Sequence, residues 1–108
     1  RRITEVYMLD YTKFKKKFDA ITLPDGTVLH LLMPKKKTLE KLMSLGKIGE
    51  DEDAVDEMYD TAAEILSNNM QKKHFAADEV ENMFDTEELG ALFEEYSEFV
   101  SGIKSDPN

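Results

Sequence analysis

The sequence predicts an α+β protein in which an N-terminal β-hairpin is followed by a mainly α-helical bundle of about four helices. Two observations lead to this fold class. A Pro24-Asp25-Gly26 turn joins two short β-prone segments, and after Pro34 apolar residues recur with the 3.6-residue period of amphipathic helices. A chain of 108 residues has material for one hydrophobic core. We therefore expect a single α+β domain over residues 8–104.

The N-terminal segment precedes a methionine, Met8. The sequence MLDYTKFKKKFD that begins there reads like the start of a small protein, so we expect residues 1–7, RRITEVY, to be a leader or an expression remnant. The alternative is that they form a β-prone arm. Further on, the spacing of Tyr11, Phe14 and Phe18 suits one or two turns of amphipathic helix over residues 10–17, and this stretch is also short enough to be extended.

The hairpin is predicted by the chemistry of its turn. Proline fixes φ at the first turn position, aspartate bonds its own backbone, and Gly26 supplies the positive φ that such a turn requires. The two strands are expected at about residues 18–23 and 27–33. Pro34 ends the second strand, because proline has no N–H to donate to a ladder.

Four helices are expected after the hairpin. Gly46 ends the first helix, an acidic run at residues 51–53 begins the second, and Asp85 with Glu88 forms a capping box at the start of the last. The second helix should fray near Ser67, because serine and the asparagines that follow it favour helix ends. The expected helical ranges are residues 38–45, 51–66, 77–84 and 86–103, and residues 105–108 form a polar tail.

Composition and charge exclude several classes of function. The absence of cysteine excludes disulfides, thiol catalysis and cysteine-based zinc sites. No run approaches the roughly 20 apolar residues of a membrane span, so we expect no membrane partner and a cytoplasmic location. The net charge of -9 argues against a nucleic-acid partner. Residues 1–47 hold 11 basic and 5 acidic side chains and residues 48–108 hold 3 and 18, which predicts a homo-oligomer through oppositely charged halves or a charged partner.

No catalytic, cofactor or metal site is predicted. The acidic run from Glu50 to Asp53 lacks the alternating oxygen ligands and the central glycine of a calcium loop, and it suits a helix N-terminus instead. Neither His30 nor His74 has a local Ser, Cys or acidic partner in a nucleophile–base pattern. Most of the six methionines are expected to fill the core, although a methionine-rich surface also suits promiscuous binding.

Three stretches of the chain, taken in order, carry a resemblance to one protein family. They are the hairpin with its basic exit, ITLPDGTVLHLLMPKKKTLEKLMSL, the helix end AAEILSNNMQKK, and the close FAADEVENMFDTEELGALFEEYSEFVSGIKSDPN. The close contains a Tyr-x-x-Phe pattern at Tyr96 and Phe99 and ends in Pro107-Asn108. With these features, the chain from Met8 onward resembles the tail assembly chaperones of long-tailed bacteriophages and related prophages of Gram-positive bacteria.

The resemblance implies a protein that is not an enzyme. Such chaperones bind the long, hydrophobic, helical tape measure protein, keep it soluble while the tail is built, and help to recruit tail tube subunits. The implied location is the cytoplasm of the bacterial host, and the protein is not expected in the mature virion. In many such phages a frameshift also makes a longer form with an extra C-terminal domain, and this chain would then be the short form.

The candidate partner-binding residues lie in two places. They are Lys35, Lys36 and Lys37 after the hairpin, and Tyr96, Phe99 and Ile103 of the last helix. An equally good interpretation of Tyr96 and Phe99 is that they belong to the core. The lysine runs on either side of the hairpin either form a patch for an acidic partner or a solvated edge that discourages strand pairing.

A rival function of another class is an acidic regulatory or inhibitor protein that mimics a nucleic acid or binds a basic partner. Its distinguishing feature would be carboxylates spaced like phosphates along one continuous face. The basic N-terminal half of the chain argues against this alternative.

Overall fold

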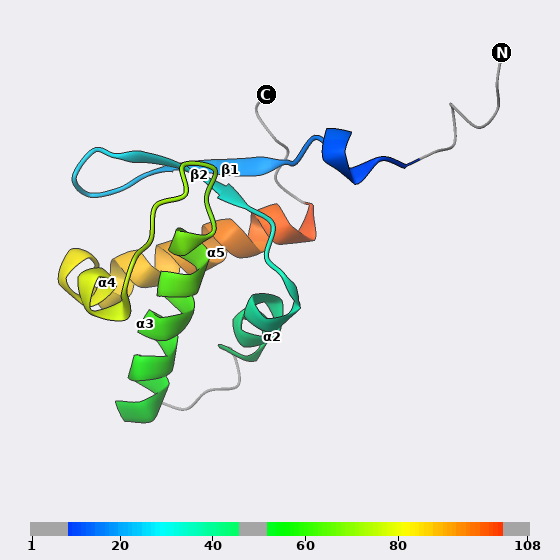
Figure 1. The fold of residues 1–108 in the computed structure, drawn as a ribbon. Coiled ribbons are helices and arrows are strands. Elements are labelled where there is room, and N and C mark those ends of the chain that lie inside the picture. Colours follow the sequence, from blue (N-terminus) through cyan, green and yellow to red (C-terminus); the bar gives the residue numbers. More distant parts are fainter. Residues whose placement is uncertain (1–8, 46–51, 103–108) are drawn as a thin grey trace, which may run out of the picture.

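The computed structural model describes residues 9–45 and 52–102 and confirms the α+β fold class (Figure 1). A two-stranded antiparallel hairpin is followed by four helices, and the hairpin lies over α5, which α3 crosses. Among the described residues, no helix has the length and apolar character needed to cross a membrane. The elements are η1 (Tyr11–Lys13), β1 (Phe18–Thr22), β2 (Val28–Leu32), α2 (Lys36–Ser44), α3 (Glu52–Ser67), α4 (Ala77–Met83) and α5 (Thr86–Ser101).

The hairpin closes as its turn chemistry predicts. The Asp25 carboxylate accepts a hydrogen bond from the Thr27 N–H at 2.9 Å, and Gly26 has φ of 93°. The Leu23 N–H donates to the Thr27 carbonyl at 2.7 Å, and the Leu23 carbonyl accepts from the Gly26 N–H at 2.8 Å, so Leu23 belongs to the turn that closes the hairpin. Each strand is therefore five residues long, and Phe18 lies opposite Leu32 at the open end.

The outer side of β2 is covered by the segment that follows α3. The Leu32 N–H donates to the Asn68 carbonyl and the Met70 N–H donates to the His30 carbonyl, each at 2.9 Å. Asn69 is buried and holds this segment in shape, because its amide donates to the carbonyls of Leu66 and of Lys73. The polar run that predicts the end of α3 therefore also supplies the backbone groups that cover β2.

The core lies between the hairpin and the helices. The α3 helix supplies its centre, with Ala62, Ile65 and Leu66 fully buried, because its apolar residues recur every three or four positions. Partly buried side chains such as Met58 and Met83 pack against it. The fully buried or nearly buried members are Leu23, Leu29, Leu31, Leu42, Tyr59, Ala62, Ala63, Ile65, Leu66, Phe75, Val80, Leu89, Leu92, Tyr96 and Phe99.

Both ends of α5 are capped. The Asp85 carboxylate accepts from the Glu88 N–H at 2.8 Å and the Glu88 carboxylate accepts from the Asp85 N–H at 2.9 Å, which confirms the predicted capping box. At the other end Gly102 has φ of 86°, a left-handed conformation that glycine adopts without steric cost.

The α2 helix is attached to α3 through a polar contact as well as through Leu42. Lys41 forms an ion pair with Glu64, and the Thr38 hydroxyl donates to the same carboxylate at 3.0 Å. Burial alone would raise the pKa of the Glu64 carboxyl, but the hydrogen bonds from Lys41 and Thr38 outweigh it and lower that pKa.

Some sequence expectations are wrong or lie outside the described residues. For residues 10–17, where the sequence left a helix and an extended stretch open, the structure has the short turn η1 and then no regular element over residues 14–17. Three methionines, Met33, Met43 and Met70, are exposed rather than in the core. The expectations for residues 1–7 and 105–108, and for the acidic start of the second helix at residues 50–51, fall outside the described part of the chain.

Candidate protein-binding groove

The candidate functional site is a groove at the open end of the hairpin, with a volume of about 380 Å³. We call it the basic groove, because apolar side chains form its surface and four lysines surround them. It is lined by Phe14, Lys15, Lys16, Lys17, Leu32, Met33, Lys35 and Asn68. Such a combination of apolar surface and one sign of charge is typical of a site that binds an oppositely charged amphipathic segment.

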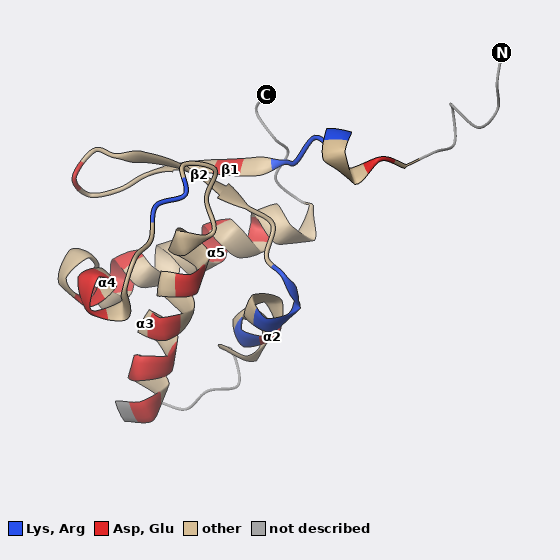
Figure 2. Ribbon diagram, in the orientation of Figure 1, with Lys and Arg blue, Asp and Glu red and all other residues tan. Residues whose placement is uncertain are grey.

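The antiparallel hairpin explains why these residues meet. Phe18 and Leu32 are register partners at the open end of the ladder. The chain enters β1 from one lysine run and leaves β2 toward the other, so the two runs emerge at the same end of the sheet (Figure 2). Lys17 and Lys35 are 18 positions apart in the sequence and still line one groove.

The apolar part of the groove is accessible to solvent. The Phe14 side chain is 55% exposed and the Met33 side chain is 44% exposed. Tyr11 is exposed as well, and its ring lies against the Phe14 ring with centroids 6.0 Å apart. Large apolar side chains gathered at one place on a surface usually mark a contact site rather than a packing defect.

Two hydrogen bonds from side chains hold the backbone of the groove at Leu32 and Met33. The Asn68 side chain donates to the Met33 carbonyl at 2.9 Å, and the Tyr96 hydroxyl donates to the Leu32 carbonyl at 2.5 Å. Burial raises the pKa of the Tyr96 phenol, and the charge of Asp19 raises it further, so the hydroxyl keeps its proton and remains a donor. Tyr96 thereby links α5 to the strand end that forms part of the groove.

The six residues predicted to bind a partner differ in their exposure to solvent. Lys35 lines the groove, and Lys36 and Lys37 are exposed at the start of α2 beside it. Tyr96 is 0% exposed and Phe99 is 3% exposed, so both side chains belong to the core. Of the two interpretations that the sequence left open for Tyr96 and Phe99, surface contact is therefore wrong and core is correct, because both residues continue the buried stripe of α5. Ile103 lies outside the described residues.

Sequence reasoning missed Phe14 and Met33. Phe14 fits the spacing of Tyr11 and Phe18, which indicated a short amphipathic turn and not a binding site, and Met33 is one of the methionines that were mostly expected to fill the core. The available signal was the position of each residue, directly outside one strand and next to a basic run. Only the antiparallel pairing turns those two positions into neighbours.

The two histidines occupy different surroundings. The His30 ring contacts the Gln71 amide at 2.5 Å and lies edge-on to the Phe18 ring, with centroids 4.9 Å apart. His74 is exposed and lines a shallow depression with Glu64. Within residues 9–45 and 52–102, no group of three or more histidine, aspartate or glutamate side chains is arranged to hold a metal ion.

Comparisons with protein-family models, with curated proteins and with solved structures gave no match to this chain.

Proposed function

We propose that the protein is a phage tail assembly chaperone that binds and solubilises the tape measure protein and helps to recruit tail tube subunits, without enzymatic activity. The observation that supports this proposal best is the basic groove, where exposed Phe14 and Met33 lie among four lysines. The resemblance of the chain from Met8 to Asn108 to this family supplies the identity of the partner.

A helical partner would use the groove in two ways. Its apolar side chains would cover Phe14 and Met33, which removes apolar surface of both proteins from water. Its acidic side chains would meet the lysines at the rim, where charge complementarity favours the correct partner and speeds association. The remaining surface carries most of the excess negative charge of the chain, and a large net charge keeps such a complex in solution.

The first test is co-expression with the tape measure protein encoded by the same genome. We expect the soluble yield of that protein to rise and a complex to co-purify. The double variant Met33→Glu/Lys35→Glu should abolish both effects, because it places carboxylates in the basic groove.

A matched control is Met43→Glu/Lys72→Glu, which makes the same chemical changes at exposed positions outside the groove. This control should bind like the natural chain. If the natural chain neither raises solubility nor co-purifies, the proposal is wrong. If both double variants bind equally well, the groove is not the contact site.

The rival function, an acidic regulator that mimics a nucleic acid, has one observation in its favour. Asp53, Asp56 and Asp60 are exposed and recur at helical spacing along α3. Their combined replacement by asparagine would abolish the activity of such a regulator and would leave a groove-dependent chaperone active. Comparison of this triple asparagine variant with Met33→Glu/Lys35→Glu therefore distinguishes the acidic regulator from the chaperone.

A further inference from the structure

The β1 strand has an edge that no other described segment covers. Ala20 and Thr22 lie opposite His30 and Val28, and His30 directs its backbone away from β1, toward Met70 and Gln71. In an antiparallel ladder both residues of such a pair point outward, so the N–H and C=O groups of Ala20 and Thr22 face away from β2. Within residues 9–45 and 52–102, the sheet has only two strands and β1 is at its edge.

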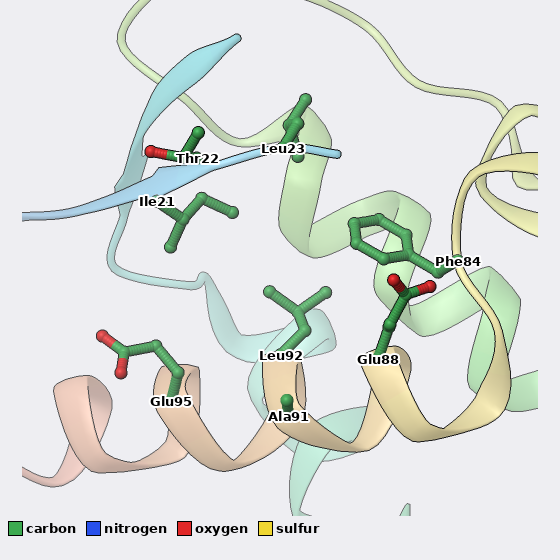
Figure 3. A pocket seen from close by; sticks show the side chains of 8 residues that line it. All are labelled: Ile21, Thr22, Leu23, Phe84, Glu88, Ala91, Leu92 and Glu95. Carbon is green, nitrogen blue, oxygen red and sulfur yellow. The ribbon is translucent and has the colours of Figure 1, made fainter. Parts of the chain in front are cut away.

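A pocket of about 200 Å³ adjoins this edge at the turn end of β1 (Figure 3). None of its lining residues comes from β2. Ile21 of β1 and Leu92 of α5 point toward each other across it, and two carboxylates of α5, those of Glu88 and Glu95, flank them. The lining residues are Ile21, Thr22, Leu23, Phe84, Glu88, Ala91, Leu92 and Glu95.

The opposite end of the same edge is basic. Lys15, Lys16 and Lys17 lead directly into β1, and all three are exposed. One end of the edge therefore carries cations and the other end carries carboxylates beside an apolar pocket. A strand edge with this asymmetry is complementary to itself after a rotation of 180°.

We propose that two copies of this chain form a dimer in which the β1 strands pair edge to edge, antiparallel, about a two-fold axis at Ala20. The product is a four-stranded sheet of order β2-β1-β1-β2. In this register Thr22 of each copy lies opposite Phe18 of the other, and their outward backbone groups complete the ladder.

The same register brings opposite charges together. Lys17 lies opposite Leu23 of the other copy, and Leu23 lines the pocket flanked by Glu88 and Glu95. Opposite residues of an antiparallel pair point to the same face of the sheet, so Lys17 is directed toward the α5 side, where these carboxylates are. Lys15, two positions earlier in the extended chain, is directed to the same side.

The lysines also disfavour a parallel pairing of the two β1 strands. In the two-fold register the Lys15 residues of the two copies are ten positions apart along the ladder, or roughly 30 Å. A parallel pairing would place the two lysine runs side by side, and repulsion would oppose it. A two-fold contact uses the β1 edge of both copies and is closed, so it leads to a dimer and not to an open fibre. The dimer goes beyond the proposed chaperone role: it shares Lys15 and Lys17 with the basic groove but uses neither Met33 nor Lys35, so Met33→Glu/Lys35→Glu should still dimerise.

The decisive variant is Ala20→Pro. Proline removes the outward N–H at the two-fold axis, whereas the ladder with β2 does not use that N–H. Sedimentation over a range of protein concentrations should show a dimer for the natural chain and a monomer for Ala20→Pro. Circular dichroism of the variant should match that of the natural chain. A natural chain that is monomeric at every concentration overturns the proposal.

A second set of variants keeps the test valid if the proline disturbs the hairpin. Lys15→Glu/Lys17→Glu should weaken the dimer by at least about tenfold in Kd, because repulsion from Glu88 and Glu95 replaces attraction. Adding Glu95→Lys to this double variant should restore part of the loss. The matched control Lys36→Glu/Lys37→Glu carries the same charge change on α2 and should dimerise normally. Equal weakening by the control overturns the proposed contact.

Amide hydrogen exchange at Ala20 and Thr22 distinguishes the second copy from another occupant. In the dimer these two amides should become protected as the protein concentration rises, and dilution should remove the protection. Protection that is independent of concentration in a monomer would mean that another part of the same chain covers the edge, and it would overturn the dimer.

Discussion

The chain contains two Tyr-x-x-Phe pairs, of which one is exposed to solvent and the other is buried in the core. In the first pair, Tyr11 and Phe14, the ring centroids are 6.0 Å apart; in the second, Tyr96 and Phe99, they are 5.9 Å apart. The local geometry is thus nearly the same. Yet the first pair is 76% and 55% exposed, and the second pair is 0% and 3% exposed.

The neighbours of each pair account for the difference. Tyr96 and Phe99 continue a stripe begun by Leu89 and Leu92, so one face of α5 can be buried along its whole length. Tyr11 and Phe18 lie one turn away from Phe14 in the sequence, but the positions directly beside Phe14 are lysines and the short turn η1 ends at Lys13, so no apolar helix face forms there. A short aromatic motif therefore does not determine whether its rings belong to the core or to a contact surface.

The largest difference between the pairs should appear in stability. Phe99→Ala should lower the free energy of unfolding by about 3–5 kcal/mol, because it leaves a cavity in the core. Phe14→Ala should change it by less than about 0.5 kcal/mol, as for other exposed side chains. Urea denaturation of the two variants measures both values. Equal losses would show that Phe14 is buried in solution and that the basic groove is closed.

The second contrast is between the hydroxyls of Tyr96 and Tyr11 and what each contributes to stability. Tyr96→Phe should lower the free energy of unfolding by about 1–3 kcal/mol, because the Leu32 carbonyl loses its donor in a partly buried place. Tyr11→Phe should have no measurable effect, since Tyr11 is exposed.

Tyr96→Phe and Tyr11→Phe should also differ in how the free energy of unfolding depends on pH. The pKa of Tyr96 in the folded state is raised above the ordinary value of 10.0, by burial and then by Asp19. Its contribution to stability is therefore complete below pH 10 and is lost as pH rises from there toward the folded pKa, by about 1.4 kcal/mol per pH unit. Tyr96→Phe should remove this part of the alkaline slope in urea denaturation, and Tyr11→Phe should retain it. An unchanged slope in Tyr96→Phe would contradict the buried phenol.

Periodicity and turn chemistry predicted the parts of the fold that depend on near neighbours. The hairpin turn follows from Pro24 and Gly26, and the start of α5 follows from the capping box of Asp85 and Glu88. The basic groove was not predicted, because Phe14 and Met33 become neighbours only through strand pairing. Burial of Tyr96 was left open for a similar reason, since its hydroxyl partner, the Leu32 carbonyl, is 64 positions away.

The smallest contrast lies in the turn that carries the exposed pair. The Asp10 carboxylate accepts hydrogen bonds from the Thr12 hydroxyl at 2.6 Å and from the Thr12 N–H at 3.0 Å, and these two bonds lower the pKa of Asp10 below its ordinary 3.8. The stabilising effect of this cap is therefore present above pH 3.8 and is lost as pH falls through the lowered pKa. Nuclear Overhauser contacts between the Tyr11 and Phe14 rings should weaken over that range.

The contacts between the Tyr96 and Phe99 rings should persist through the same acid titration. These two rings lie on α5, and the Asp10 carboxylate that caps η1 does not hold them together. Asp10→Asn provides the control, since its amide oxygen still accepts from Thr12 but does not titrate, and the Tyr11–Phe14 contacts should then be independent of pH. Simultaneous loss of both ring contacts would mean that acid unfolds the whole domain at once. In that case the exposed pair would depend on the core for its geometry, and the two motifs would not be independent.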